Sequence, residues 1–269
     1  MRRFFVAAVF SLITGLAGCS GGGPAVPATA PPVRPSATSA VATSSTATSR
    51  QATRSTADGF TVDGSRPVPA NGSQDTYAQA AGASCDSATL AADRRLGGEI
   101  ADGFSAASLP ASAGLLRHFL AGEGTAVGYP AGSAVSRLAM TSAAFAAVDK
   151  EVKAAVTQQL KAGSTKVRLS AAQLPLVPFD SAGGDLYWGF RGTQGLSVTG
   201  RGQRAGASYA GTLTYVIRDS YGFPEGDTLG GFGAPMRYLQ TVCGAPQHAG
   251  GAHWFPDTIT VTVPFRQPG

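Results

Sequence analysis

Acidic, basic and imidazole side chains gather between residues 219 and 257, and these are the residue types that general acid–base catalysis uses. Asp219 and Tyr221 lie two positions apart, and Arg237 and His253 follow in the same stretch. If these side chains shared one cleft, Asp219 could act as an acid or a base beside Arg237 or a histidine. The structural alternative is that Asp219 caps a turn at the end of a strand, with Tyr221 as a core or rim residue.

Histidines and carboxylates also raise the question of a metal. His248 and His253 flank two glycines, Asp257 follows four residues later, and His118 lies five residues before Glu123. A protein metal site needs three or four ligands supported by further hydrogen bonds. Neither group supplies that set, and the chain has no zinc-protease motif, nucleophile elbow, phosphate-binding loop or dinucleotide fingerprint. We therefore expect no metal and no cofactor.

Asp219 and Tyr221 resemble the Asp-x-Tyr motif of the colicin M-type lipid II hydrolases, which cleave a cell-wall precursor outside the inner membrane. These two residues alone match, because the His-Arg pair that follows in that family is absent here. The resemblance implies an envelope hydrolase that acts on a wall precursor through Asp219, with Arg237 or a loop histidine as its partner.

The amino terminus indicates export. Arg2 and Arg3 precede an apolar stretch that is too short for a permanent membrane span, and the tetrad 16–19 is Leu-Ala-Gly-Cys. This tetrad resembles the bacterial lipobox, whose cysteine becomes the diacylated first residue of the mature protein. It implies a signal peptide over 1–18, palmitate-type acylation of Cys19 and a location on the outer face of the cell membrane. An ordinary signal peptide with a chance cysteine is the alternative.

Composition separates a tether from a domain. Residues 19–72 are mostly Pro, Ala, Ser, Thr and Gly, which cannot bury enough apolar surface to fold, so we expect a disordered tether there and a single domain over 73–269. Residues 1–72 hold six basic and two acidic residues, which leaves 15 basic and 14 acidic for the domain. A domain this close to neutral, without basic runs among aromatics, predicts no nucleic-acid binding.

With Cys19 assigned to the lipid, Cys85 and Cys243 remain. An even pair in an exported protein predicts a disulfide between them. The alternative is a catalytic role for Cys243 as a nucleophile paired with a histidine.

Hydrophobic periodicity predicts an α+β fold in which amino-terminal helices pack on a carboxy-terminal, mostly antiparallel sheet. The helices are expected at 87–104, 109–121 and 142–160. Strands are expected at 186–191, 195–200, 209–217 and 258–265, with a glycine-rich hairpin loop over 200–206 and a further short strand at 236–242.

The long excursion between the last two main strands, residues 219–257, is the expected functional surface because long connections often carry function. Its candidate ligand-contacting aromatics are Tyr221, Phe223, Tyr238 and Trp254.

Segments 190–195, 219–223, 236–241 and 254–257 are similar to those of a group of uncharacterised actinobacterial secreted lipoproteins. This resemblance implies a place in the envelope and no particular activity. Two hypotheses therefore stand: a membrane-anchored module that binds a cell-wall or envelope ligand, or a hydrolase of a wall precursor.

Overall fold

A mixed sheet forms the framework of the protein. The computed structural model describes residues 59–69, 84–180, 184–224, 231–244, 248 and 250–269. Within them, six strands lie in the order β2-β6-β5-β4-β1-β3. The strands are β1 (Gly59–Arg66), β2 (Val127–Tyr129), β3 (Lys166–Leu169), β4 (Gly195–Ala205), β5 (Ser208–Tyr221) and β6 (Phe255–Pro268). The pairs β1/β3 and β2/β6 are parallel and the other pairs are antiparallel, so the predicted α+β fold is confirmed.

Period-two alternation explains the long central strands. In β6 the inward residues Ile259, Val261 and Phe265 are buried while Thr262 and Pro264 between them are exposed. β5 pairs with β6 along its whole length, from Ser208 opposite Pro268 to Tyr221 opposite Phe255. The predicted loop over 200–206 is shorter in the structure, because β4 continues to Ala205 and the chain turns at Gly206, whose φ is +61°.

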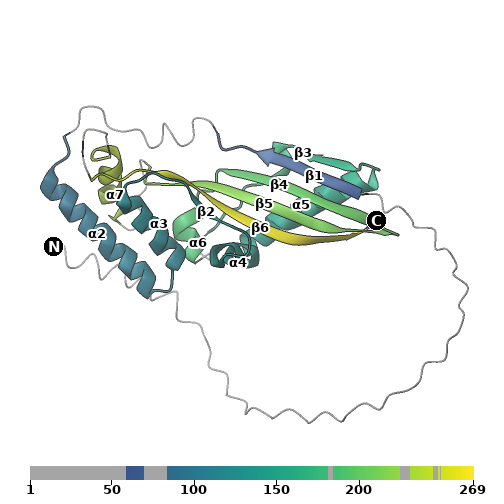
Figure 1. Ribbon diagram of the computed structural model, residues 1–269, viewed down its shortest axis with the longest axis horizontal. Helices are drawn as coiled ribbons and strands as arrows, with labels where there is room; N and C mark the ends of the chain where they lie inside the picture. Colours follow the sequence, from purple (N-terminus) through teal and green to yellow (C-terminus); the bar gives the residue numbers. More distant parts are fainter. Residues whose placement is uncertain (1–58, 70–83, 181–183, 225–230, 245–247, 249) are drawn as a thin grey trace, which may run out of the picture.

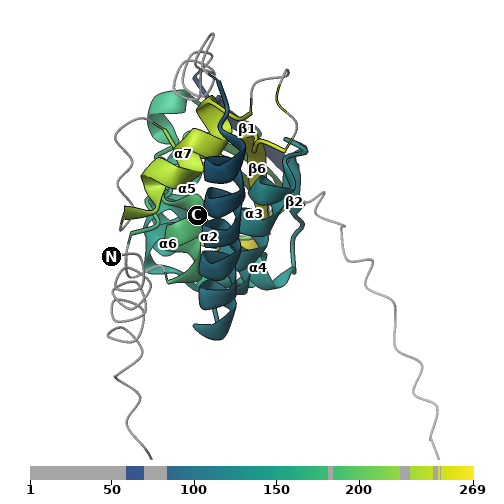
Figure 2. The same ribbon diagram turned by 90° about the vertical axis from the view of Figure 1, so that its left-hand side faces the viewer.

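Within the same described ranges, six helices cover the inward side or the end of the sheet. They are α2 (Ser87–Ala106), α3 (Pro110–Ala121), α4 (Ala134–Thr141), α5 (Ala143–Lys161), α6 (Asp185–Phe190) and α7 (Gly233–Thr241), with a single 3-10 turn at Ala171–Gln173. Figure 1 shows α5 running along the strands while α2, α3, α6 and α7 gather at one end of them, and Figure 2 shows α2 foremost at that end.

Local signals explain where the predicted helices begin. The side chain of Ser142 caps α5 by accepting a hydrogen bond from Phe145 N at 3.1 Å. The α2 helix is capped by Asp86, which accepts from Thr89 N at 2.7 Å. The apolar stripe of α5 faces the sheet: Phe145 meets the ring of Tyr215 at 5.1 Å, and the Tyr209 hydroxyl donates to Leu160 O at 3.0 Å.

Two predicted strands are helices instead. The stretch predicted as a strand at 186–191 is α6, and the stretch predicted at 236–242 lies mostly in α7. In α6 the buried residues Leu186, Gly189 and Phe190 follow helical spacing. Gly189 lacks a side chain where a Cβ would lie 2.6 Å from Leu115 of α3, so the two helices approach closely.

The domain begins earlier than predicted. β1 lies inside the stretch 19–72 that we expected to be a tether, and it is paired on both sides, with β3 and β4. Phe60 is 4% exposed, and its ring packs edge-on against Tyr209 and Phe265. The sheet therefore includes a strand whose surroundings in sequence are rich in Ser and Thr.

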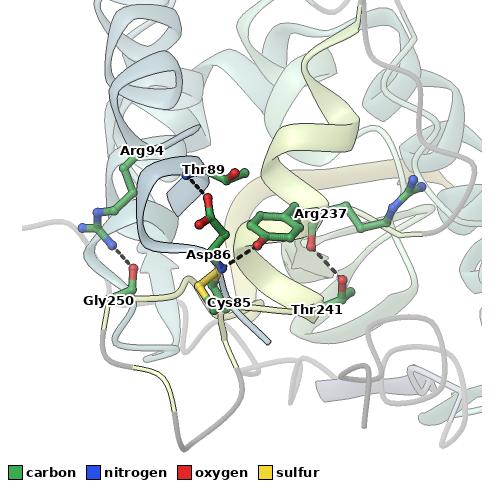
Figure 3. The surroundings of a disulfide bond; sticks show 9 residues. Cys85, Asp86, Thr89, Arg94, Arg237, Thr241 and Gly250 are labelled. Carbon is green, nitrogen blue, oxygen red and sulfur yellow. Dashed lines mark hydrogen bonds between the residues drawn. A yellow bond between two sulfur atoms is a disulfide. The ribbon is translucent and has the colours of Figure 1, made fainter. Parts of the chain in front are cut away.

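The predicted disulfide is confirmed: Cys85 and Cys243 are bonded, with their Cα atoms 4.9 Å apart (Figure 3). It joins the residue before the cap of α2 to the residues after α7, across 158 positions of sequence. In the same place Asp86 N donates to the Tyr238 hydroxyl at 2.9 Å, and Arg94 donates to the carbonyl of Gly250. Closing so long a loop stabilises the fold by at most ~5 kcal/mol in the chain-entropy account.

The helices of the described ranges include none with the length and apolar character that a membrane span requires. The predicted signal peptide over 1–18, Cys19 and the tether up to residue 58 lie outside the described residues.

Candidate functional site

Two carboxyl groups face each other inside the protein. Asp219 on β5 and Asp257 on β6 are cross-strand partners, and both side chains point to the inward side of the sheet. Directly opposite residues of an antiparallel pair have Cβ atoms about 4.5–5.5 Å apart. Asp219 is 6% exposed and Asp257 is 0% exposed. We call this the aspartate pair.

The two members of the aspartate pair are held differently. Asp219 Oδ1 accepts a hydrogen bond from Ser220 N at 2.8 Å, and the backbone of Gly192 also bonds this carboxyl. Neither carboxyl oxygen of Asp257 has a hydrogen-bond partner among the described residues. A buried carboxylate without partners is strongly unfavourable, so this environment favours the protonated form of Asp257.

Burial raises the pKa of both groups. It raises the pKa of Asp219 from 3.8 to about 7, although the hydrogen bonds from Ser220 and Gly192 oppose that rise. Burial, and then the charge of Asp219, raise the pKa of Asp257 well above its ordinary value. At neutral pH the aspartate pair therefore retains at least one proton, as two carboxyls at this separation generally do.

Tyr129 lies between the influence of the aspartate pair and that of a third carboxyl group, Asp185. Burial raises the pKa of Tyr129 on β2 to about 12, with the charges of Asp257 and Asp185 adding to the shift. Asp185, at the start of α6, is itself occupied: its carboxylate accepts hydrogen bonds at 2.7 Å from Ala111 N, Ser112 N and the Ser112 hydroxyl. Asp185 thereby caps the first turn of α3 and binds α3 to α6.

Aromatic rings close the space beside the aspartate pair. The cross-strand neighbours Tyr221 and Phe255 stack at 5.4 Å, and Phe119 and Phe223 pack edge-on around Tyr221. A proton-sharing carboxyl pair could serve acid–base chemistry only where a substrate reaches it. In this structure both carboxyls are enclosed, so the arrangement is that of a buried structural pair.

The other residues predicted to join Asp219 in a cleft are Arg237 and His253. No hydrogen bond or ion pair joins Asp219 to Arg237 or His253 within the described ranges. Arg237 lies on α7 and extends away from the disulfide in Figure 3. His253 is half-buried beside Gly124. The contacts of the described residues therefore do not support the predicted constellation.

The predicted contact aromatics are mostly internal. Tyr221 and Phe223 are 8% and 2% exposed, which corrects their assignment to a ligand surface: β5 continues to Tyr221 and turns its ring inward, and Phe223 follows into the core two residues later. The Tyr238 hydroxyl accepts from Asp86 N near the disulfide, and Trp254 is half-buried.

The remaining candidate side chains also have structural positions. His118 Nε2 lies 2.8 Å from the carbonyl oxygen of Thr125, and its ring packs edge-on against Phe255 at 4.5 Å. Among the residues that the structure places, no three His, Cys, Asp or Glu side chains come close enough to hold a metal ion. Cys243 is bonded to Cys85, so its thiol does not act as a nucleophile here.

A different surface stands out on the opposite side of the sheet, which we call the open face. Its side chains are exposed or half-buried, and most of them carry hydroxyl groups. The open face consists of Thr61, Asp63, Ser65, Lys166, Arg168, Ser197, Thr199, Arg201, Thr212, Thr214, Val216, Arg218, Thr258, Thr260, Thr262, Pro264 and Arg266.

Cross-strand pairing aligns these groups in rows. Thr199, Thr214 and Thr262 are register partners on β4, β5 and β6, and the hydroxyls of Thr214 and Thr262 lie 3.2 Å apart. Arg218 donates to the Ser197 hydroxyl at 3.0 Å. Rows of this kind present hydrogen-bond donors and acceptors at strand spacing, ~4.8 Å across the sheet and ~6.7 Å along it.

Comparisons of the chain with protein-family models, with curated proteins and with solved structures found no match.

The aspartate pair and the open face were both missed in the sequence, although signals for them exist. Asp219 lies two residues beyond Ile217, and Asp257 lies two residues before Ile259, each on the inward parity of a predicted strand. This parity puts both carboxyls on the inward side of the sheet, and the register of β5 against β6 then places them opposite each other. The threonines between the apolar residues of β6 form the second side of the strand by the same alternation.

Proposed function

We propose that the protein is a lipid-anchored binding module of the cell envelope, displayed on the outer face of the membrane, and that the open face meets its ligand. The observation that carries this proposal is the broad array of hydroxyl and basic side chains on strands whose other side is buried. The lipobox at residues 16–19 supports the anchor. The disulfide fits an oxidising compartment outside the cytoplasm.

The alternative, a hydrolase of a wall precursor acting through Asp219, finds little support in the geometry. Its proposed acid is enclosed beside Asp257, and among the described residues no hydrogen bond or ion pair joins it to Arg237 or His253. A binding role needs no such constellation, because hydrogen-bonding groups at fixed spacing on a rigid sheet suffice for recognition.

The test uses the full chain in its host, with envelope fractions prepared from the same cells. Wild type should partition with the membrane, and Cys19→Ala should release it, because two acyl chains anchor stably where none remains. Purified full chain should also sediment with wall fragments. Replacing Thr199 and Thr262 together by Glu should weaken that sedimentation by about tenfold, since unfavourable charge at an interface is costly.

The matched control places two glutamates on the exposed side of α5, at Ala154 and Gln158. It should leave wall binding unchanged. The proposal would be contradicted if neither wall nor membrane fractions retained the wild-type protein. It would also be contradicted if the Thr199 and Thr262 variant and the control lost wall binding equally.

A further inference from the structure

The open face carries an imbalance of charge. It holds five basic residues, Lys166, Arg168, Arg201, Arg218 and Arg266, and one acidic residue, Asp63. None of the five has a carboxylate within ion-pair distance among the residues described, where the ion pairs are Arg95–Glu99, Arg117–Asp102 and Lys153–Asp149. The domain is close to neutral as a whole, so the excess of positive charge on the open face is offset by negative charge elsewhere in the domain.

Four of the five cations form a patch. Lys166 and Arg201 are both register partners of Thr61, and Arg168 lies opposite Asp63 in the next row. Arg266 lies on β6 opposite Ala210, and β6 is two strands away from the strand of Arg201. Strand geometry places these four within roughly 20 Å across the sheet and roughly 13 Å along it. A shallow hollow beside Arg266, lined also by Ser208, Ala210 and Pro268, continues the patch at the end of the hairpin.

Strand propensity explains the threonines without invoking any ligand, because β-branched residues suit exposed strand positions. Propensity does not explain the charge. Cations can protect an edge strand from pairing, which accounts for Lys166 and Arg168 on the edge strand β3. Protection of an edge strand does not account for Arg201 on the interior strand β4 or for Arg218 on β5.

The side chains around the cations narrow the class of ligand. The open face has no aromatic side chain on which nucleic-acid bases could stack. Val216 is its one large aliphatic residue, so it offers little apolar surface for insertion into a bilayer. What remains is hydroxyl groups beside cations, the complement of a chain that bears both hydroxyl and acidic groups.

We infer that the open face binds an acidic polysaccharide of the cell wall, a glycan chain carrying phosphate or carboxylate groups at intervals. This inference rests on the proposed function and adds the ligand class. The cations meet the acidic groups, and the threonine rows between them hydrogen-bond the sugar hydroxyls. A linear chain suits the surface because the patch is extended and nearly flat, whereas a small ligand would need an enclosed pocket.

The test compares two triple variants of the full chain, both carrying Cys19→Ala so that acyl chains contribute nothing. The face variant is Lys166→Gln, Arg168→Gln and Arg201→Gln. The control variant, Arg95→Gln, Lys150→Gln and Lys161→Gln, removes the same charge from exposed helical positions. Binding is measured to dextran phosphate, to alginate and to uncharged dextran, with polyuridylate and phosphatidylglycerol vesicles as competing classes.

The affinities of wild type and control for dextran phosphate or alginate should agree within about threefold, because charges more than a Debye length from the polymer are largely screened. The face variant should lose on the order of 100-fold, since each Lys or Arg near an anionic surface strengthens binding roughly fivefold. Binding should weaken steeply with salt, and uncharged dextran should bind poorly. If the face variant melted early, Arg168→Gln and Arg201→Gln would be measured singly, each with about a fivefold loss.

Equal losses in both triple variants, or equally tight binding of uncharged dextran, would overturn the inference. Tighter binding of polyuridylate or vesicles through the same three residues would also overturn it and assign the face to that class. If wall fragments still retain the face variant as well as wild type, the acidic-glycan inference fails while the binding module stands. If wild type binds neither wall fragments nor any polymer, both fail.

Discussion

On strands β5 and β6, neighbouring residues point to opposite sides of the sheet, and the two sides carry charge of opposite sign. Asp219 and Asp257 point inward, while Arg218 and Arg266 point outward. No acidic residue of these two strands points outward and no basic residue points inward. The alternation of a strand has therefore separated charge as well as polarity.

The two sides of the sheet differ in the free energy that is needed to place a charged side chain there. Outward arginines keep their hydration, so their charge is nearly free of a folding penalty and stays available to a ligand. Inward carboxyls lose their hydration, and the raised pKa values show that the fold favours their protonated forms.

The first prediction compares adjacent residues on the two sides. Phe265→Ala should lower the free energy of unfolding by about 3–5 kcal/mol, because it opens a cavity among buried rings. Arg266→Ala should change it by less than about 0.5 kcal/mol, as exposed substitutions usually do. Chemical denaturation of both variants at fixed pH measures the difference. Similar losses in the two would show that the sheet has no open side.

The second prediction concerns the aspartate pair. The pKa of Asp219 is 3.8 ordinarily and about 7 in the fold. Between these values the folded state binds more protons than the unfolded chain, so stability should fall as pH rises from about 4 to 7, by up to about 1.4 kcal/mol per pH unit for the group. Below that window the stabilisation is fully present, and above it the loss is complete.

Asp219→Asn removes the titration of this group and should reduce the slope, which leaves the part that the raised pKa of Asp257 contributes. Asp63→Asn, on the open face, is the matched control and should leave the wild-type slope in place. Urea unfolding at several pH values measures it. Unchanged slopes in Asp219→Asn would show that the carboxyl ionises freely and is reached by water. The same variant addresses the hydrolase alternative: turnover of a labelled wall precursor by wild type, lost in Asp219→Asn, would favour an enzyme.

Much of the fold could be predicted because the periodic segments were long. The helix α5 shows five buried apolar residues at spacings of three or four, and β6 alternates over its whole length. Shorter segments carry too few repeats to decide. In α6 every residue from Leu186 to Phe190 except Gly189 is apolar or aromatic, so its pattern is as compatible with a helix buried on several sides as with a strand.

Tertiary partners decided the rest. β1 has a strand-like alternation of Phe60 and Val62, but it lies in a Ser- and Thr-rich stretch, and only pairing with β3 and β4 fixes it as a strand. The residue that Asp219 faces could not be predicted from the sequence for a related reason. Asp219 and Arg237 are both chemically capable, yet the register of β5 against β6 turns Asp219 toward Asp257, and sequence spacing contains no information about that register.

The smallest predicted effect lies on the open face. Thr199→Val keeps the shape and strand propensity of the side chain and removes its hydroxyl, so the free energy of unfolding should change by less than about 0.5 kcal/mol. Dextran phosphate binding should weaken by roughly fivefold, the value of one hydrogen bond of ~1 kcal/mol. Thr157→Val on α5, whose hydroxyl bonds Lys153 O within its own helix, should leave binding unchanged. Isothermal titration at low salt measures both. Equal affinities for all three proteins would mean that the cations alone hold the polymer and that the threonine rows serve only the strands.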